Sequence, residues 1–348
     1  MTKALYVGID NLARKVKKMY IGVDGIARKV QKAYVGVDST ARLFFSAELK
    51  LNYYGTATDL LEAQGGDNVV AATTVGNYAL FGGGLSEPNA VAYDTSLTRT
   101  IPNGLSIGRS YLVATTVGNY ALFGGGIYEY YDDDEWLSDY PSNVDAYDTS
   151  LTRTNPTELS VGRASLAATT VGNYALFCGG YNEWSSWLPL DAVDAYDASL
   201  TRTNPTGLSV GRDGLAATTV GDYALFGGGW GGNATTLATV DVYDISLTRV
   251  NPTELSICRA SLAATTVGNY ALFCGGSSHD LNGDRKNDYH VNTDAYDASL
   301  TRTNPTGLSV AREGLAATTV GDYAIFGGGY NYFDNNKNFC TVDVYTVG

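Results

Sequence analysis

The fold is decided by the segment Ala167-Ala168-Thr169-Thr170-Val171-Gly172-Asn173-Tyr174-Ala175-Leu176-Phe177. Its centre, Ala-Thr-Thr-Val-Gly, occurs six times in the 348 residues, beginning at Ala72, Ala114, Ala168, Ala217, Ala264 and Ala317. A period of about 50 residues is typical of propellers and solenoids, in which each unit buries its apolar face against the next unit. The six copies therefore predict six structural units.

Each copy has the pattern of four short strands. In the third copy these strands are 166–171, 174–178, 193–196 and 200–203. The turn Gly172-Asn173 joins the first strand to the second, and the turn Asp197-Ala198-Ser199 joins the third strand to the fourth. Gly-Asn is a two-residue hairpin signal because both residues tolerate positive φ. The first strand consists of small Ala, Thr and Val residues, which suit an innermost strand. The sequence thus predicts an all-β protein with few helices.

The order of the features that recur in every copy resembles the kelch repeat. After the Phe come two or three glycines, a stretch such as Val193-Asp194-Ala195-Tyr196-Asp197, and then an arginine before the next copy. The resemblance covers about residues 50–348 and implies a six-bladed β-propeller of four-stranded antiparallel blades. The tryptophan that is usual in the outer kelch strand is missing here, and Arg153 and its equivalents lie near that position.

The sixth copy shows only three strands, since its pattern stops at 342–347. We expect the segment Leu49-Lys50-Leu51-Asn52-Tyr53-Tyr54 to supply the fourth strand and close the ring, which would leave no open sheet edge. The expected domains are an arm at 1–46 and the propeller at 47–348. On this topology the arm leaves at the end of the ring opposite the variable loops.

Charge separates the arm from the propeller. Residues 1–50 carry a net charge of +6, and residues 51–348 carry −19, within a total of −13. An acidic body argues against nucleic-acid binding, because phosphate groups need a cationic surface. The chain has no apolar run long enough to span a membrane, and its first residues lack the apolar core of a signal peptide. A neighbouring copy of the acidic body is one candidate partner for the arm, which would make a homo-oligomer.

The arm has a repeat of its own. Tyr6-Val7-Gly8-Ile9-Asp10 recurs at 20–24 and 34–38, with basic segments between the copies. Asp10-Asn11 and its equivalents are hairpin signals, so we expect short hairpins that need a partner surface. The motif is similar to N-terminal segments of tail-associated proteins from phages and prophages of Gram-positive bacteria. That similarity implies an anchor for assembly with other virion or tail proteins; a solvated basic arm or nucleic-acid tether is the alternative.

The loops between the second and third strands carry the expected binding function. They vary in length and sequence, whereas the other turns are nearly identical, and they hold all four tryptophans. Tyr, Trp, Asn, Ser and Gly are the residues of antibody paratopes, and aromatic rings also stack on sugars. The predicted ligand-binding residues are Tyr128, Tyr130, Tyr131, Trp136, Tyr140, Tyr181, Trp184, Trp187, Trp230, Tyr330, Tyr332 and Phe333. The alternative is that these rings only pack on neighbouring blades.

One loop has spacing suited to Ca²⁺. Asp280, Asn282, Asp284 and Asp288 place oxygen atoms at intervals that resemble the calcium loops of dockerin, EF-hand and integrin-type repeats. Arg285 stands where those loops usually have glycine, and a solvated acidic loop is the alternative.

Catalytic interpretations find little support in the sequence. A copper site like that of galactose oxidase needs histidines in separate blades, and both histidines here lie in one loop. Sialidase-type repeats are absent from the sequence. A glycosidase would have to use the acidic run from Asp132 to Glu135. The repeat arginines before each first strand could form an anion-binding ring or serve the framework, and we favour the framework.

Together these features predict a non-enzymatic adhesion protein, a receptor-binding component of a phage or phage-derived tail. Its partners would be a host cell-surface glycan or protein through the loops and tail proteins through the arm, without nucleic acid and without membrane insertion. It would be located in the virion, or in the cytoplasm before assembly. An intracellular kelch-type adaptor and a carbohydrate-active enzyme are the alternatives.

Overall fold

The computed structural model describes residues 70–84, 88–132, 135–182, 188–279, 287–332 and 337–347, together with six strands between residues 6 and 46. The chain divides into two units, Met1–Asp59 and Leu60–Gly348. The division therefore falls later in the chain than the boundary expected between residues 46 and 47. The segment 49–54, expected to close the ring, lies outside the described residues.

The strands of the first unit pair as three antiparallel hairpins. They are β1 (Tyr6–Ile9) with β2 (Leu12–Lys15), β3 (Met19–Val23) with β4 (Ile26–Val30), and β5 (Lys32–Val37) with β6 (Thr40–Ser46). Each hairpin begins with one copy of the Tyr-x-Gly repeat and continues into the segment that follows it.

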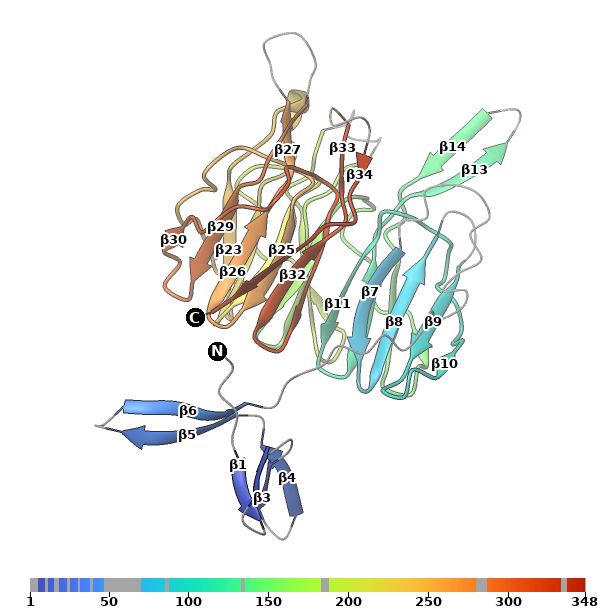
Figure 1. Ribbon diagram of the computed structural model, residues 1–348. Coiled ribbons are helices and arrows are strands. Elements are labelled where there is room, and N and C mark those ends of the chain that lie inside the picture. Colours follow the sequence, from blue (N-terminus) through green and yellow to red (C-terminus); the bar gives the residue numbers. More distant parts are fainter. Residues whose placement is uncertain are drawn as a thin grey trace. The chain divides into compact units, whose positions relative to one another are not determined.

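The described part of the second unit contains six antiparallel sheets of three or four strands, here called blades one to six (Figure 1). Blade one holds β7 (Val70–Val75), β8 (Tyr78–Gly83), β9 (Ala90–Tyr93) and β10 (Arg99–Thr100). Blade two holds β11 (Val113–Val117), β12 (Tyr120–Gly124), β15 (Val144–Tyr147) and β16 (Arg153–Thr154). Blade three holds β17 (Ala167–Val171), β18 (Tyr174–Cys178), β19 (Val193–Asp197) and β20 (Arg202–Thr203). The expected all-β, six-bladed propeller is confirmed.

The remaining blades repeat this order. Blade four holds β21 (Ala216–Val220), β22 (Tyr223–Gly227), β23 (Val240–Asp244) and β24 (Arg249–Val250). Blade five holds β25 (Ala263–Val267), β26 (Tyr270–Cys274), β29 (Thr293–Asp297) and β30 (Arg302–Thr303). The described part of blade six is three-stranded, with β31 (Ala316–Val320), β32 (Tyr323–Gly327) and β35 (Val342–Thr346).

The core lies between successive blades. One face of each blade presents Val and Leu, and the facing side of the next blade presents Ala, Phe and Tyr; Val171 and Leu176 thus share a cluster with Phe226 and Tyr243. The aromatic pair of each blade meets edge to face, as Phe226 and Tyr243 do at 6.0 Å, the geometry that ring quadrupoles favour. In blade two the second strand ends in glycine where the ring of the next blade lies: a β-carbon on Gly124 would be 2.8 Å from Phe177.

Threonines link the innermost strands around the axis. The Thr170 hydroxyl of blade three donates to the Thr116 carbonyl of blade two at 2.7 Å and lies 3.0 Å from the Thr115 hydroxyl. The same pattern joins each pair of successive blades from one to six. This explains why the first strand of every repeat reads Ala-Thr-Thr-Val, since a larger side chain would separate the strands.

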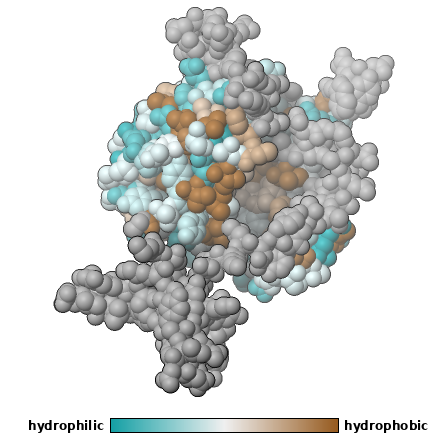
Figure 2. Space-filling model, in the orientation of Figure 1, coloured by the Kyte–Doolittle hydropathy of each residue, from teal (hydrophilic) through white to brown (hydrophobic). Residues whose placement is uncertain are grey.

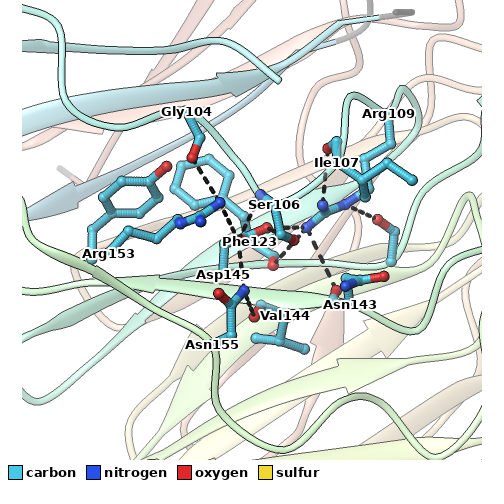
Figure 3. A network of polar contacts seen from close by, with 12 residues as sticks. Gly104, Ser106, Ile107, Arg109, Phe123, Asn143, Val144, Asp145, Arg153 and Asn155 are labelled. Carbon is cyan, nitrogen blue, oxygen red and sulfur yellow. Dashed lines mark hydrogen bonds and ion pairs between the residues drawn. The ribbon is translucent and has the colours of Figure 1, made fainter. Parts of the chain in front are cut away.

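Buried ion pairs fix the outer strands and connectors (Figure 3). In blade two, Arg109 donates from Nη2 to Asp145 at 2.8 Å, and both side chains are fully buried. The other Asp145 oxygen accepts from Asn155 and from the backbone N–H of Ser106, both at 2.9 Å. Because every charge has a partner, the pair holds three chain segments without leaving an isolated buried ion.

The same ion pair recurs in every later blade. The pairs are Arg163–Asp194, Arg212–Asp241, Arg259–Asp294 and Arg312–Asp343. The five arginines are fully buried, so the framework role expected for them is confirmed and they offer no surface for an anion. Blade one lacks the pair, because Val91 stands at the aspartate position and Asp67 at the arginine position of the sequence.

Candidate binding face

The loops between second and third strands and the connectors that lead into each first strand lie at the same end of every blade. This end, called the loop face, carries four additional elements (Figure 1). They are the hairpin of β13 (Tyr128–Asp132) and β14 (Glu135–Asp139), the 3₁₀ turn η2 (Gly232–Ala234), the pair β27 (Ser277–His279) and β28 (Asn287–Tyr289), and the pair β33 (Tyr330–Asn331) and β34 (Lys337–Asn338). The variable sequences therefore build structure at one end of the propeller.

Each variable loop begins at a fixed position. In blades two to six, the residue after the buried arginine forms an isolated antiparallel bridge to the first loop residue; the bridges are Ser110–Ile127, Ala164–Tyr181, Asp213–Trp230, Ala260–Ser277 and Glu313–Tyr330. In blade four both bonds form, with Trp230 N–H donating to Asp213 at 2.7 Å and Asp213 N–H to Trp230 at 3.1 Å. Tyr181, Trp230 and Tyr330 thus occupy equivalent, rigidly held positions.

The connectors are also bonded to one another around the axis. Each N–H donates to the carbonyl of the connector before it, from Ser165 to Tyr111, Gly214 to Ser165, Ser261 to Gly214 and Gly314 to Ser261, at 2.9–3.1 Å. All five residues have positive φ. This row of bonds joins the connectors of blades two to six, so the residues at these positions belong to a stiff frame.

Two aromatic rings lie on glycines of this row. A β-carbon on Gly214 would be 3.1 Å from Cδ1 of Trp230, and one on Gly314 would be 3.0 Å from Cε1 of Tyr330. The absence of a β-carbon on these glycines therefore lets the rings approach the connector backbone. Blades three and five have Ser165 and Ser261 at this position, so the positive φ alone does not demand glycine and the ring contact accounts for it.

Asp213 lies beside these aromatic residues. Burial raises the pKa of Asp213 from 3.8 to about 6, and its own backbone N–H opposes that rise. No ion pair joins Asp213 to another residue of the described part of the chain. A partly desolvated carboxylate without a cation is a strong hydrogen-bond acceptor for a polar ligand.

Tyr181 and Tyr111 belong to the same region. Burial raises the pKa of Tyr181, while a hydrogen bond with Tyr140 opposes the rise. Asp213, Tyr111 and Glu129 raise it further through their electrostatic fields, which places these groups close to Tyr181. Tyr111 is 43% exposed and therefore available at the surface.

Glu313 and Tyr330 form the equivalent group in blade six. Glu313 is buried, and its carboxylate accepts a hydrogen bond from the Ser277 hydroxyl. Burial raises the pKa of Tyr330 to about 12, with Glu313 as the next cause and Tyr111 as a smaller one. Tyr289 meets the Tyr330 ring edge-on at 6.5 Å. We call Tyr111, Tyr181, Asp213, Trp230, Glu313 and Tyr330 the mouth cluster.

The blade-two hairpin carries a separate aromatic pair. Tyr128 and Tyr130, two residues apart on one side of β13, stack with ring centres 5.5 Å apart. Tyr131 and Trp136 are opposite each other in the register, and their side chains lie outside the described part. Tyr140 is 9% exposed and packs with Ile127 and Ala164. For this residue the structure therefore agrees with the alternative that the ring packs on neighbouring blades.

The other predicted residues are spread over the loops. Tyr332 is 63% exposed in the blade-six loop. Trp184, Trp187 and Phe333 lie outside the described residues, as do Asp280, Asn282 and Asp284 of the proposed calcium loop. Asp288 is exposed on β28. Over the described ranges, no group of three or more His, Cys, Asp or Glu is arranged to hold a metal ion, and no helix is long and apolar enough to cross a membrane.

Sequence reasoning did not identify Tyr111, Asp213 and Glu313. A signal was available, because the two residues after each repeat arginine vary within an otherwise uniform segment: Ser-Tyr, Ala-Ser, Asp-Gly, Ala-Ser and Glu-Gly. In a repeat whose framework is constant, variable positions next to a framework residue indicate contacts that are specific to one blade.

These features define a six-bladed, kelch-like β-propeller with an aromatic and acidic loop face. Among solved structures, the chain is similar to one described as "Structure of YjhT", a kelch-repeat protein, with a TM-score of 0.63 and 15% sequence identity over 80% of this chain and 95% of that chain. This similarity establishes the fold alone. No family model matches the sequence, and no curated protein matches it.

Proposed function

We propose that the protein is a non-enzymatic binding or adhesion protein whose loop face binds a cell-surface glycan or protein. The observation that carries the proposal is the mouth cluster, in which Trp230 lies on Gly214 beside Asp213 and Tyr330 lies on Gly314 beside Glu313. Framework contacts are repeated from blade to blade, whereas aromatic and acidic side chains vary at this one end.

The chemistry of the cluster suits a polyhydroxylated ligand. Flat aromatic rings give contact area at a low cost in conformational entropy, and the carboxylate of Asp213 accepts hydrogen bonds from hydroxyl groups. Because the rings are already held by bridges and by connector bonds, little ordering remains to be done when a ligand binds.

The test is binding of the full-length protein to an array of cell-surface glycans. Replacement of both Trp230 and Tyr330 by Ala should reduce affinity for the best glycan at least about tenfold. Tyr270→Ala is the matched control, because Tyr270 is 37% exposed at the start of β26, at the opposite end of the blade. Unchanged affinity of the double variant, with unchanged folding, would contradict the proposal.

The array also separates the alternatives. Capture of a peptide or protein and of no glycan would favour a kelch-type adaptor. Release of sugar from the immobilised polysaccharide would favour a carbohydrate-active enzyme.

We propose that the N-terminal hairpins anchor the protein in a larger assembly, a phage or phage-derived tail. The net charge of +6 in residues 1–50 and the repeated Tyr-x-Gly hairpins support an attachment role. The protein would then act in the virion and be cytoplasmic before assembly. Tail genes beside the coding gene, and loss of the protein from purified particles when residues 1–46 are deleted, are the expected results.

The loop 280–288 is proposed to bind Ca²⁺ through Asp280, Asn282, Asp284 and Asp288, on the spacing of its oxygen-bearing residues. Calorimetry of the full chain should show Ca²⁺ heat that disappears in Asp284→Asn. Absence of heat at millimolar Ca²⁺ would remove this part of the proposal.

A further inference from the structure

The charged groups that act on the tyrosines of the mouth cluster are negative. Burial raises the pKa of Tyr181, and the carboxylates of Asp213 and Glu129 raise it further. Burial, followed by the carboxylate of Glu313, raises the pKa of Tyr330 to about 12. Three carboxylates from blades two, four and six therefore give this part of the loop face a negative electrostatic potential.

The nearest arginines in the sequence do not neutralise this charge. Arg212 and Arg312 directly precede the two acidic residues of the mouth cluster, but both arginines are fully buried. Each is paired at 2.7 Å with an aspartate of its own blade. Within the described part of the chain, no Lys or Arg forms an ion pair with Asp213 or Glu313.

The backbone holds both carboxylates in place. Asp213 exchanges two backbone hydrogen bonds with Trp230, and Glu313 exchanges two with Tyr330, at 2.7–3.1 Å. Glu313 is 5% exposed, and its carboxylate accepts a hydrogen bond from the Ser277 hydroxyl. Burial also raises the pKa of Asp213, to about 6. Because both groups have lost part of their hydration, a cation that reaches them is attracted more strongly than it would be in water.

Aromatic rings adjoin these carboxylates. Asp213 is bridged to Trp230, and Glu313 is bridged to Tyr330. Tyr111 is 43% exposed and acts electrostatically on Tyr330, which places its hydroxyl in the same region. The face of an aromatic ring attracts cations, and that of Trp does so most strongly. The rings and the carboxylates therefore favour the same kind of ligand group, a positively charged nitrogen.

Exposed apolar surface is concentrated on another part of the propeller. Val320 of β31 and Val342 and Val344 of β35 are 55–58% exposed, and Figure 2 shows apolar surface gathered in the region of these strands. At the mouth cluster, a neutral glycan would leave the negative charges uncompensated, and an acidic glycan would be repelled by them. Negative charge beside aromatic rings is thus the property that selects the ligand there.

We propose that the glycan bound by the loop face carries free amino groups, whose protonated nitrogens bind Asp213 and Glu313 and contact the rings of the mouth cluster. This inference rests on the proposed binding function of the loop face and specifies the chemical class of its ligand. The sugar hydroxyls use the remaining polar contacts. Acetylation of the nitrogen removes the positive charge and should remove the preference.

The first experiment compares glucosamine oligomers with N-acetylglucosamine oligomers of the same length, immobilised for binding of the full-length protein at pH 6.5. The affinity for the free amine should be at least about tenfold higher. The difference should shrink as salt is added, because salt screens the attraction between charges. Oligomers of N-trimethylated glucosamine carry a permanent positive charge and should bind as the free amine does.

The second experiment removes the charge of each carboxylate and keeps the shape of the side chain. Asp213→Asn and Glu313→Gln should each lower the affinity for the glucosamine oligomers about tenfold and leave the affinity for the N-acetylated oligomers unchanged within about twofold. Asp222→Asn is the matched control, because Asp222 is exposed in the turn between β21 and β22, at the opposite end of blade four. It should leave both affinities unchanged.

The outcomes separate this inference from the binding function itself. Equal affinity for the free and the N-acetylated oligomers, or an Asp213→Asn variant that keeps the preference, would overturn the inference and leave the binding function standing. Binding of no glycan in any form would overturn both. Capture of a lysine-rich peptide and of no amino glycan would overturn the inference in favour of a protein ligand.

Discussion

The carboxylate of Asp194 in blade three accepts a hydrogen bond from the backbone N–H of Ser160, in the connector that leaves blade two, at 3.0 Å. The same carboxylate pairs with Arg163 at 2.8 Å and accepts from Asn204 at 2.7 Å. One buried side chain therefore joins the end of one blade to the beginning and the outer edge of the next. This frame lets the loops vary without loss of the fold.

Asp194→Asn should lower the free energy of unfolding by about 3–5 kcal/mol, because Arg163 would remain buried and charged without its partner. Denaturation in urea measures the change. The double variant Arg163→Met with Asp194→Val should recover part of the loss, since Val91 occupies the aspartate position of blade one. A double variant less stable than Asp194→Asn would contradict this explanation.

The stability contribution of Asp213 should depend on pH. Its pKa is raised from 3.8 to about 6 in the folded protein, so between these values the folded state binds more protons than the unfolded state. Stability from this group is therefore lost as pH rises from about 4 to about 6 and stays constant above that range. Asp213→Asn should abolish this pH-dependent loss in the free energy of unfolding. The loss is on the order of 1 kcal/mol, because the group is partly solvated.

The measurement is the melting temperature of both proteins at pH 4 and pH 7.5. At pH 7.5 the melting temperature of the variant should be higher than that of the native protein. At pH 4 the two melting temperatures should be equal. Parallel curves for the two proteins would show that Asp213 titrates normally.

Gly214→Ser should weaken ligand binding about fivefold or more with a small change in stability. The β-carbon would meet Trp230 at 3.1 Å and displace the ring, whereas the backbone accepts serine at this φ in Ser165 and Ser261. Affinity for the array ligand is the readout. Ser165→Gly serves as the control and should leave affinity unchanged within about twofold; a Gly214→Ser variant with native affinity would show that the ring position is unimportant.

The architecture was predictable because each interface is built from the same residues. Ala-Thr-Thr-Val-Gly fixes the inner strand, the glycines after Phe fix its neighbour, and Asp197 with Ser199 fixes the outer turn through a 2.9 Å hydrogen bond. These patterns span only a few residues, so they can be recognised in the sequence alone. Six copies of them predict six blades.

The mouth cluster was only half predictable. Tyr181, Trp230 and Tyr330 stood out as aromatic residues in variable loops. Tyr111, Asp213 and Glu313 did not, because they lie in connectors that are otherwise framework and reach the loop residues only through long-range bridges such as Glu313–Tyr330. Tyr140 shows the opposite case, where an aromatic loop residue serves the core.

Thr74→Val tests energetically whether blades one and six meet. The Thr170 hydroxyl donates to the Thr116 carbonyl at 2.7 Å, so Thr170→Val should cost about 1 kcal/mol in the free energy of unfolding. In a ring closed within one chain, Thr74 donates in the same way to the Thr319 carbonyl of blade six. Thr74→Val should then cost the same as Thr170→Val when both are measured in urea. A cost near zero for Thr74→Val, with the full cost for Thr170→Val, would mean that blades one and six do not meet.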